Sequence, residues 1–518
     1  MGNRLPRRIL SPQTVACEPG LLAAGAAWLM TAKTLTFGVN FLLPILLVRR
    51  LSVSEFGLYK QAFLIVNTAI GMLPLGFATS AFYFWPRQAE RRDGLVFNIL
   101  LFYSFVTGVA GLILVWRPTL LAAIFHDPEL VKYGAAIGAV VLLWGASSFL
   151  ETVAIANGET RLASGFIVAI QISKALFLIG AVLWSPTVGA LVGAALIHGV
   201  IQMSVAVAYL GSRFGRFWTR LDISLLRVQL AYALPHGFAA WLYWVHVELH
   251  QYFVAHRFNA AVFAIYAVGC FQLPFLAILC ESVGSIAIPR VSRLHKEGRF
   301  QEIVTLTADL ARKLALILFP TYAFLLVTRR ELITVLFTKQ YLASAPILAL
   351  NLTLIPLAIV LTAGDPVIRA HNEARFFLTK VRLALTGLTL AGLWFATNRF
   401  GLLGPIAVVV VVTFLERVAL ALKVGSLLEL GRRDLVLFKD LPKLGLASAA
   451  AGLVALMARE FFAGWGAMVV LLGCALVFSV AYVALLLVSG VPTRGEREAV
   501  LRFFVRPRDA DAPRVKAA

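Results

Sequence analysis

The sequence predicts an all-α polytopic membrane protein with about fourteen transmembrane helices. It further predicts two parallel six-helix repeats (lobes) around a central cavity, plus two C-terminal helices. The first reason is composition: 60% of the 518 residues are hydrophobic and 14% are charged, whereas soluble domains have about 45–50% and about 25%. A soluble fold cannot hide so many apolar side chains, so we expect lipid around the protein. The other reasons are a series of long apolar segments and an internal repeat.

The long apolar segments give the helix count. A helix that crosses the hydrocarbon core needs about 20 mostly apolar residues. The segments that meet this requirement are 22–48, 56–84, 94–116, 131–156, 162–184, 188–211, 229–255, 260–288, 307–327, 344–369, 376–397, 402–428, 441–461 and 465–489. The longest connection between them, around 290–306, is too short for a catalytic domain. We therefore expect no enzyme, and the glycine-rich phosphate loop of ATPases is absent from the sequence as well.

The net charge of +21 is spread in short runs between the apolar segments. This distribution argues against a nucleic-acid surface, which gathers its cations along one soluble face. If the N-terminus is cytoplasmic, the loops on that side carry about three times as many Lys and Arg residues as the opposite loops, which is the usual bias of membrane proteins. Both termini are therefore expected in the cytoplasm. The basic tail at 491–518 has two open interpretations, a segment lying on the anionic leaflet or a disordered tail.

Cysteine and histidine spacing indicates no metal site. The four cysteines, Cys17, Cys270, Cys280 and Cys474, form no CxxC pair, so neither a disulfide framework nor a zinc site is expected. His246 and His250 are spaced like metal ligands on a helix, but no third ligand lies near them in the sequence. No cofactor is expected, and coupling to H⁺ or Na⁺ is left open.

The chain repeats itself after about 210 residues, as three ordered anchors show. The segment from Arg50 to Tyr59 matches the segment from Arg257 to Tyr266, with Arg, Phe and Tyr in register. Arg117 to Phe125 matches Arg329 to Phe337. The third anchor pairs Glu151, Ala156, Glu159 and Arg161 with Asp365, Ala370, Glu373 and Arg375.

Each copy of the repeat holds an even number of helices, so both copies enter the membrane from the same side. The two halves are then related by an axis along the membrane normal, with the substrate path between them. The predicted domains are an N-terminal cytoplasmic tail (1–21), an N-lobe (22–215), a C-lobe (216–430), two added helices (431–490) and a basic cytoplasmic tail (491–518).

Polar residues inside the apolar segments need a partner or water, because a charge at mid-membrane costs roughly 2.5–3.5 kcal/mol on insertion scales. The first segment carries Lys33, Thr36 and Asn40 on one helical face. The seventh carries His236, Tyr243, His246 and His250 in one stripe. The two stripes either line a central polar cleft or form hydrogen-bonded seams between helices. Lys174 and Arg417 are further cationic candidates for substrate binding.

Acidic residues inside the segments are candidates for ion coupling. Glu151 and Asp365 occupy equivalent places in the repeat, and Glu281 is a third candidate. Each either binds a coupling cation or proton, or braces a helix end. Glu416 and Arg417 are adjacent, and for them or their neighbours a structural ion pair is the alternative. Glu248 lies on the opposite side of its helix from the histidine stripe, where it either pairs with a neighbouring helix or lies near the headgroups.

Small residues also recur in the segments. Gly134 with Gly138, and Gly189 with Gly193, have the spacing that lets membrane helices approach closely.

Several stretches resemble a known family. The segments from Gly25 to Lys33 and from Leu47 to Tyr59, the repeat of the latter at Arg257 to Tyr266, and the turn from Asn157 to Arg161 resemble the polysaccharide transporter (oligosaccharide flippase) family. This family belongs to the multidrug/oligosaccharidyl-lipid/polysaccharide exporter superfamily. The resemblance covers nearly the whole chain.

The resemblance implies two six-helix lobes around a central cationic cavity that opens to one side at a time. It implies flipping of an undecaprenyl-diphosphate-linked oligosaccharide across the bacterial inner membrane, for O-antigen, capsule, exopolysaccharide or lipopolysaccharide synthesis. A polysaccharide polymerase and glycosyltransferases are the implied partners. Many members carry an acid about six positions before the equivalent of Arg257, where this chain has Gln251, which puts coupling through that position in doubt. Fixed cations suit a diphosphate, and Lys33 is the leading candidate.

Three other functions stay open on the sequence. A cation-coupled drug exporter and a peptidoglycan-precursor flippase would share the fold. A membrane subunit of a glycan polymerase or synthase belongs to another class.

Overall fold

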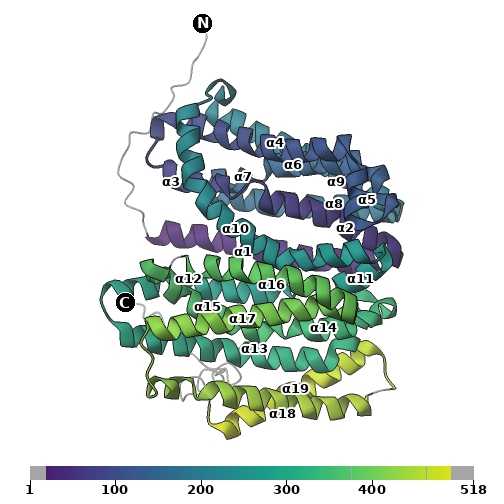
Figure 1. The fold of residues 1–518 in the computed structure, drawn as a ribbon, viewed down its shortest axis with the longest axis vertical. Coiled ribbons are helices and arrows are strands. Elements are labelled where there is room, and N and C mark those ends of the chain that lie inside the picture. Colours follow the sequence, from purple (N-terminus) through teal and green to yellow (C-terminus); the bar gives the residue numbers. More distant parts are fainter. Residues whose placement is uncertain (1–18, 375, 463, 492–518) are drawn as a thin grey trace, which may run out of the picture. The chain divides into compact units, whose positions relative to one another are not determined.

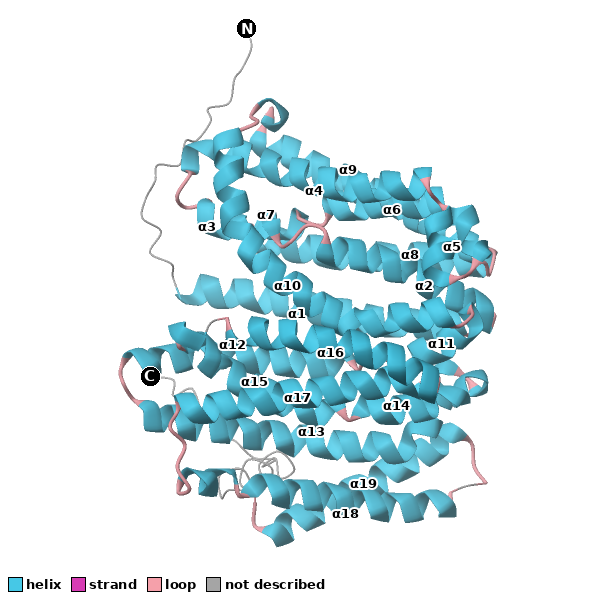
Figure 2. Ribbon diagram, viewed as in Figure 1, coloured by secondary structure: helices cyan, strands magenta, loops and turns pink. Residues whose placement is uncertain are grey.

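The computed structural model describes residues 19–374, 376–462 and 464–491, and every regular element in them is a helix (Figure 2). The predicted N-terminal tail, Cys17, Arg375 and nearly all of the basic C-terminal tail lie outside the described residues, as does the side chain of His236. Within the described part of the chain, the predicted all-α polytopic class is confirmed.

The chain divides into two compact units (Figure 1). The first comprises residues up to Arg50, Ala62–Ala122 and Pro128–Trp241, and the second comprises Leu51–Gln61, Ala123–Asp127 and the residues from Leu242 onward. The division falls inside a long helix, whereas the sequence places the N-lobe and C-lobe boundary at 215/216. The first unit holds most or all of α1 (Pro19–Val48), α2 (Val53–Met72), η1 (Phe77–Thr79), α3 (Ser80–Phe84), η2 (Ala89–Arg91), α4 (Arg92–Trp116), α5 (Thr119–Phe125), η3 (Pro128–Tyr133), α6 (Gly134–Ser147), α7 (Leu150–Ala156), α8 (Thr160–Trp184), α9 (Val188–Phe214), η4 (Phe217–Thr219) and the first half of α10 (Ile223–Arg257).

The second unit holds the second half of α10 and the remaining helices. These are α11 (Ala260–Gly269), α12 (Pro274–Lys296), α13 (Phe300–Phe337), η5 (Lys339–Ser344), α14 (Ala345–Leu352), α15 (Leu354–Ala370), η6 (Asn372–Ala374), α16 (Phe377–Phe400), α17 (Leu403–Leu427), η7 (Asp434–Phe438), α18 (Asp440–Phe461) and α19 (Ala467–Ser489). In this unit α16 packs along α17, α12 packs along α15, and α18 and α19 pack on each other and on α13.

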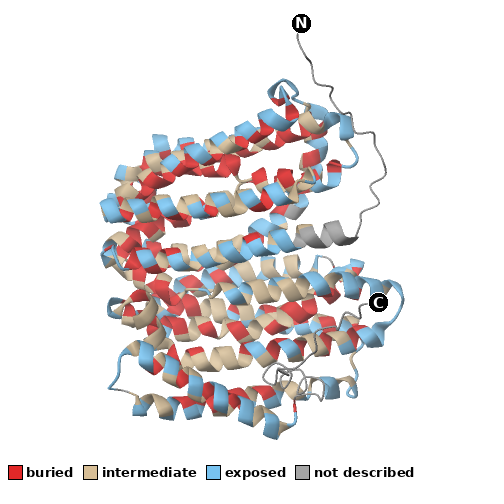
Figure 3. Cartoon of the chain, turned by 180° about the vertical axis from the view of Figure 1, so that it is seen from behind, coloured by how far each residue is buried: buried red, intermediate tan, exposed pale blue. Residues whose placement is uncertain are grey.

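Thirteen helical segments of the described residues are long and apolar enough to cross a membrane. The fourteenth predicted span, 229–255, lies in α10, which at 35 residues is long enough but carries Gln229, Glu248 and several histidines. Large apolar side chains face outward on these helices, among them Trp184 at 93%, Val488 at 86% and Phe461 at 82% exposure, and Figure 3 shows exposed residues along the helices of both units. Such surfaces need lipid, so the chain is a multi-pass membrane protein.

Four of the predicted spans are not single helices, contrary to the continuous segments expected from the sequence. Span 56–84 is interrupted where Leu75 and Gly76 adopt positive φ values of 48° and 63°. Span 260–288 breaks before Pro274, which begins α12, because a proline ring disfavours helical geometry in the residue before it.

The two other interrupted spans share one plan. Each begins with a 3₁₀ helix of six residues, η3 or η5. Each then continues as two consecutive α-helices, α6 and α7 in the first unit, α14 and α15 in the second. η3 starts at Pro128 and η5 starts at Lys339. The number of residues between these two starts is close to the number that separates the two copies of the second sequence anchor. This common order of elements supports the predicted repeat.

A chain of buried polar side chains fixes the start of α10 in the first unit. Asn98 donates through Nδ2 to the carbonyl oxygen of Asp222 at 2.9 Å and to Gln229 Oε1 at 3.0 Å. Gln229 Nε2 in turn donates to Ser80 Oγ at 3.2 Å. Asp222 also caps the helix, since its carboxylate accepts from Ser224 Oγ and from the Leu225 amide. These two donors hold the pKa of Asp222 below its ordinary value.

The two small-residue pairs differ in the structure. A Cβ on Gly138 would lie 2.5 Å from the carbonyl oxygen of Gly111, so α4 and α6 touch there through their backbones. A Cβ on Gly134 would lie equally close to Pro118. By contrast, nothing lies within 4 Å of a Cβ on Gly193. The close approach predicted from the sequence is therefore present at the first pair and absent at Gly193.

We predict that Gly138→Ala lowers the free energy of unfolding in detergent by about 1–3 kcal/mol, because the added methyl group forces α4 and α6 apart. Gly193→Ala is the matched control and should leave stability unchanged or raise it slightly. Thermal unfolding of the purified variants measures both. Equal stability of the two variants would contradict the backbone contact between α4 and α6.

Candidate functional site

A cluster of charged and aromatic side chains lies inside the second unit, where α10, α16 and α17 contribute residues. Its members are Tyr243 and His246 of α10, Arg382 of α16, and Glu416 and Arg417 of α17. Glu416 lies in the middle of a 25-residue span and its side chain is only 3% exposed. A charged group at such a position must be paired or must face water or a ligand.

Glu416 is shared between two arginines. Arg382 Nε donates to Glu416 Oε1 at 2.9 Å, and Arg417 Nη1 lies 3.0 Å from Glu416 Oε2. The side chains of Arg382 and Arg417 are 15% and 11% exposed. Two guanidinium groups against one carboxylate leave this cluster with a net charge of +1.

Some donors in the cluster have no acceptor. Arg417 Nε is buried and makes no hydrogen bond within the described residues, and Arg417 Nη1 has only the ion pair with Glu416. His246 Nδ1 is also buried and has no hydrogen-bond partner there. His246 interacts electrostatically with Glu416, Arg382 and Arg417. Unsatisfied buried donors are costly, so an anion with several acceptor oxygens is the chemical complement of this cluster.

Tyr243 gives the cluster an accessible aromatic face. Its side chain is 44% exposed, and the Arg382 guanidinium lies 4.8 Å from the ring centroid. Such a cation–π contact orients the guanidinium. The aromatic face and the charged groups together suit an anionic ligand that also has an apolar face.

Sequence reasoning found most of this cluster and missed Arg382. Tyr243, His246 and Arg417 are predicted substrate residues, and the ion pair expected as the alternative for Glu416 and Arg417 is present. Arg382 lies near the start of the predicted span 376–397 and is not among the predicted site residues. Its signal was Glu416 in the next predicted helix, since the expected ion pair of Glu416 or Arg417 could also involve a neighbouring helix.

The polar face of α1 contacts other helices of the first unit. Asn40 Oδ1 accepts a hydrogen bond from Gln171 of α8, which is the helix seam described by the second interpretation of that face. Lys33 is exposed and interacts electrostatically with Glu151 of α7. Binding of a substrate by Lys33 and Asn40, and ion coupling by Glu151, stay predictions.

Lys174 lies over an aromatic ring in the first unit. Its Nζ is 5.8 Å from the Trp144 ring centroid, and the same ring contacts His198 edge-on at 5.4 Å. The sequence did not predict the contacts among Lys174, Trp144 and His198, because no local spacing pattern connects α6, α8 and α9.

Other predicted residues have partners on or near their own helix. His250 Nδ1 is hydrogen-bonded to the Tyr266 hydroxyl at 2.7 Å, so this histidine joins α10 to α11. Asp365 pairs with Arg369 one turn later on α15, at 2.6 Å. Glu281 is exposed on α12.

Glu248 has partners on α10 and α2 of the second unit. Gln251 donates to its carboxylate, and Lys60 interacts with it electrostatically. Of the two interpretations left open by the sequence, the interaction with Lys60 favours contact with a neighbouring helix.

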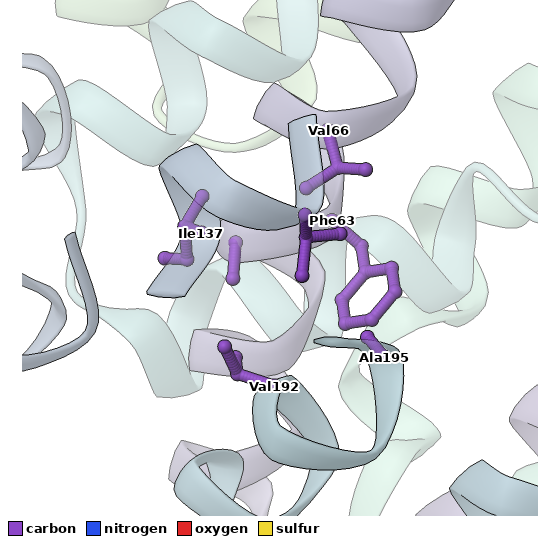
Figure 4. Close-up of a pocket in the computed structure, with 7 residues that line it drawn as sticks. Phe63, Val66, Ile137, Val192 and Ala195 are labelled. Atoms are coloured by element: carbon purple, nitrogen blue, oxygen red, sulfur yellow. The ribbon is translucent and has the colours of Figure 1, made fainter. Parts of the chain in front are cut away.

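A separate apolar pocket lies in the first unit between α2, α6 and α9. Phe63, Val66, Ile137, Val192 and Ala195 line it (Figure 4), and every lining side chain is apolar. It has no group that could hold an anion, so we do not assign the polar chemistry to this pocket.

The matching family model is described as polysaccharide biosynthesis protein and covers residues 46–346, more than half of the chain. The chain belongs to this polysaccharide biosynthesis family. This confirms the family suggested by the resemblance. The matched residues include the first two repeat anchors and α10. No curated protein sequence matches the chain.

Solved structures of flippases and transporters share the fold. The lipid II flippase MurJ, in an inward closed conformation, matches 93% of this chain and 100% of its own length at 12% identity, with a TM-score of 0.69. The eukaryotic MATE transporter AtDTX14 matches 83% of this chain and 100% of its own at 13% identity, with a TM-score of 0.54. A variant of the Vibrio cholerae MATE transporter VcmN matches 80% and 100% at 17% identity, with a TM-score of 0.53.

We predict that Glu416→Gln destabilises the protein by about 3–5 kcal/mol, because it leaves two buried guanidinium groups without a counter-charge. Thermal unfolding in detergent measures the effect. The double variant Glu416→Gln/Arg382→Gln should recover part of the loss, since one of the two orphaned charges is then removed. Glu297→Gln is the control, because the pair between Glu297 and Arg293 at 2.8 Å is exposed and should contribute nothing measurable. If Glu416→Gln behaved like the control, Glu416 would not hold the cluster together.

Proposed function

We propose that this protein flips a lipid-diphosphate-linked oligosaccharide across the bacterial inner membrane by alternating access, for the synthesis of a surface polysaccharide. The single observation that carries the proposal is the buried cluster of Arg382, Glu416 and Arg417, with its net positive charge and its unsatisfied donors. Membership in the polysaccharide biosynthesis family supports the glycan part of the substrate. The fold shared with a flippase and with exporters supports the transport step.

The charges suit a diphosphate better than a cationic drug. A diphosphate bridge carries two negative charges and several acceptor oxygens, and guanidinium groups bind phosphate oxygens in pairs. The cluster offers Arg382 and Arg417 with a single carboxylate between them. A cationic ligand would meet net repulsion there, so this cluster does not favour the drug-exporter alternative.

Glu416 gives the cluster a means of releasing its ligand. In the structure it occupies the guanidinium groups itself, and a phosphate must take its place to bind. When the substrate leaves, the carboxylate pairs with both arginines again, so that only the single surplus positive charge of the cluster remains. This exchange keeps binding weak enough for turnover, because the transported anion competes with an internal one.

Tyr243 lies where it could contact the first sugar. Its half-exposed ring is adjacent to Arg382, and sugar rings present apolar C–H faces that pack on aromatic rings. A sugar next to the diphosphate would then pack on Tyr243 while the arginines hold the phosphates. The ring and the guanidinium groups together would recognise the junction between lipid carrier and glycan.

The same proposal includes topology and partners. The excess of Lys and Arg in one set of loops supports cytoplasmic termini. Glycosyltransferases would supply the lipid-linked glycan on the cytoplasmic side, and a polymerase would consume it on the other. Glu151, Asp365 and Glu281 remain the proposed residues for H⁺ or Na⁺ coupling.

We predict that Arg382→Ala/Arg417→Ala reduces flipping at least about tenfold, since each charge-assisted hydrogen bond contributes about 1.5–3 kcal/mol. The assay measures lipid-linked glycan accessible on the outer face of spheroplasts from a strain lacking the chromosomal gene. Arg432→Ala, an exposed cation after α17, is the control and should flip at the normal rate. Protein abundance in the membrane is measured alongside for each variant.

Two results would contradict the proposal. If the gene deletion caused no accumulation of lipid-linked glycan on the inner face, the flippase function would be wrong. If the double arginine variant were as active as the control at equal abundance, the cluster would not be the phosphate site.

A further inference from the structure

A polar cavity lies at one end of three membrane helices in the second unit, and none of its lining residues belongs to the cluster around Glu416. Residues near the end of α13, in η5, at the end of α18 and at the start of α19 line it, and its volume is about 480 Å³. Because it lies where the spans end, it belongs at the level where a bilayer has its headgroups. A cavity of this size is within the range of ligand sites.

Among the described side chains that line this cavity, two charged ones form an ion pair with each other, whereas other cations do not. Arg459 Nε donates to Glu331 Oε1 at 2.9 Å, and these two side chains are 22% and 12% exposed. Arg330 and Lys339, which also line the cavity, belong to no ion pair in the described part of the chain. Glu460 also lines the cavity. The three cations Arg330, Lys339 and Arg459 and the two acids Glu331 and Glu460 therefore give it a net charge of +1.

One acceptor in the cavity is unused. Glu331 Oε2 is buried and accepts no hydrogen bond from any described residue. The site therefore presents two unpaired cations together with one acceptor that lacks a donor. Its complement is a molecule with a negatively charged phosphate and, beyond it, a hydroxyl or ammonium group that can donate.

The surroundings of the cavity favour a lipid over a soluble ligand. Trp465 lines it and is 65% exposed, and tryptophan is enriched at the headgroup level of membranes. On α18, Met457 and Phe461 are 75% and 82% exposed. Leu472 of α19 is 62% exposed. Exposed apolar side chains of α18 and α19 would contact the acyl chains of surrounding lipids.

We propose that this cavity binds the headgroup of a bilayer phospholipid whose phosphodiester is followed by a hydrogen-bond donor. Arg330 and Lys339 hold the phosphate oxygens, and Glu331 Oε2 accepts from the glycerol hydroxyl or the ethanolamine ammonium group. A choline headgroup has no N–H or O–H donor and cannot complete the site. The cavity thus selects phosphatidylglycerol and phosphatidylethanolamine against phosphatidylcholine, independently of the transported substrate.

Native mass spectrometry of the purified full chain tests this site with three added phospholipids that have identical oleoyl chains. Phosphatidylglycerol and phosphatidylethanolamine should be retained at least about tenfold more tightly than phosphatidylcholine, since only their headgroups can donate a charge-assisted hydrogen bond to Glu331 Oε2. Arg330→Ala/Lys339→Ala should lose this retention, and Arg330→Lys/Lys339→Arg should keep most of it. Arg432→Ala/Arg433→Ala removes two exposed cations elsewhere in the unit and should bind like the original chain.

Glu331→Gln separates the donor contact from the phosphate contact. It should reduce the difference in retention between phosphatidylethanolamine and phosphatidylcholine, while Arg330 and Lys339 still bind the phosphate of both lipids. Equal retention of all three lipids by the original chain would overturn the proposal, as would unchanged binding by Arg330→Ala/Lys339→Ala. Displacement of the lipid by glycerol 1-phosphate at equal concentration would show a site for soluble phosphates instead and would also overturn it.

Discussion

The carboxylate of Glu416 is the constraint on which the interior of the second unit depends. The side chain that carries it is 3% exposed, lies near the middle of an apolar helix, and faces two arginines from α16 and α17. Removing a charge from water costs several kcal/mol, which only close opposite charges can offset. α16 and α17 must therefore be placed so that both arginines reach the Glu416 carboxylate. The surplus positive charge that results is what a transported anion can use.

A second constraint is the need to satisfy backbone polar groups in lipid. Long helices meet it, and the described residues of this chain contain helices and no strands. The interruptions near Gly76 and before Pro274 leave backbone groups to be satisfied by other means. Turns do so in part, since the Phe77 amide donates to the Pro74 carbonyl oxygen at 2.8 Å. Interrupted spans are typical of transporters, where they permit local movement.

The fold could be predicted largely from the sequence, because helix length and apolar composition are local properties. The positions of the spans, the repeat and the family all follow from segments of ten to thirty residues. The interruptions of four spans were not predicted, since the hydrophobicity continues across them. Leu75 with a positive φ, for example, has no signal in composition.

The candidate site was predicted in part, and the missing parts are contacts between distant segments. Periodicity placed Tyr243 and His246 on one face of α10, and adjacency drew attention to Glu416 and Arg417. Arg382 lies 34 residues before its partner Glu416, and no periodic pattern joins the two. Likewise, Asn40 pairs with Gln171 across 131 residues.

Photo-crosslinking inside the membrane tests the central claim most directly. A photoreactive amino acid at position 243 lies beside Arg382, whereas one at position 422 replaces a leucine of α17 that is 70% exposed. The account predicts that lipid-linked glycan becomes attached at position 243 and far less at 422, and that added polyprenyl diphosphate suppresses the attachment. Equal labelling at both positions, or labelling at 243 that polyprenyl diphosphate does not reduce, would contradict binding of the substrate by the cluster around Glu416.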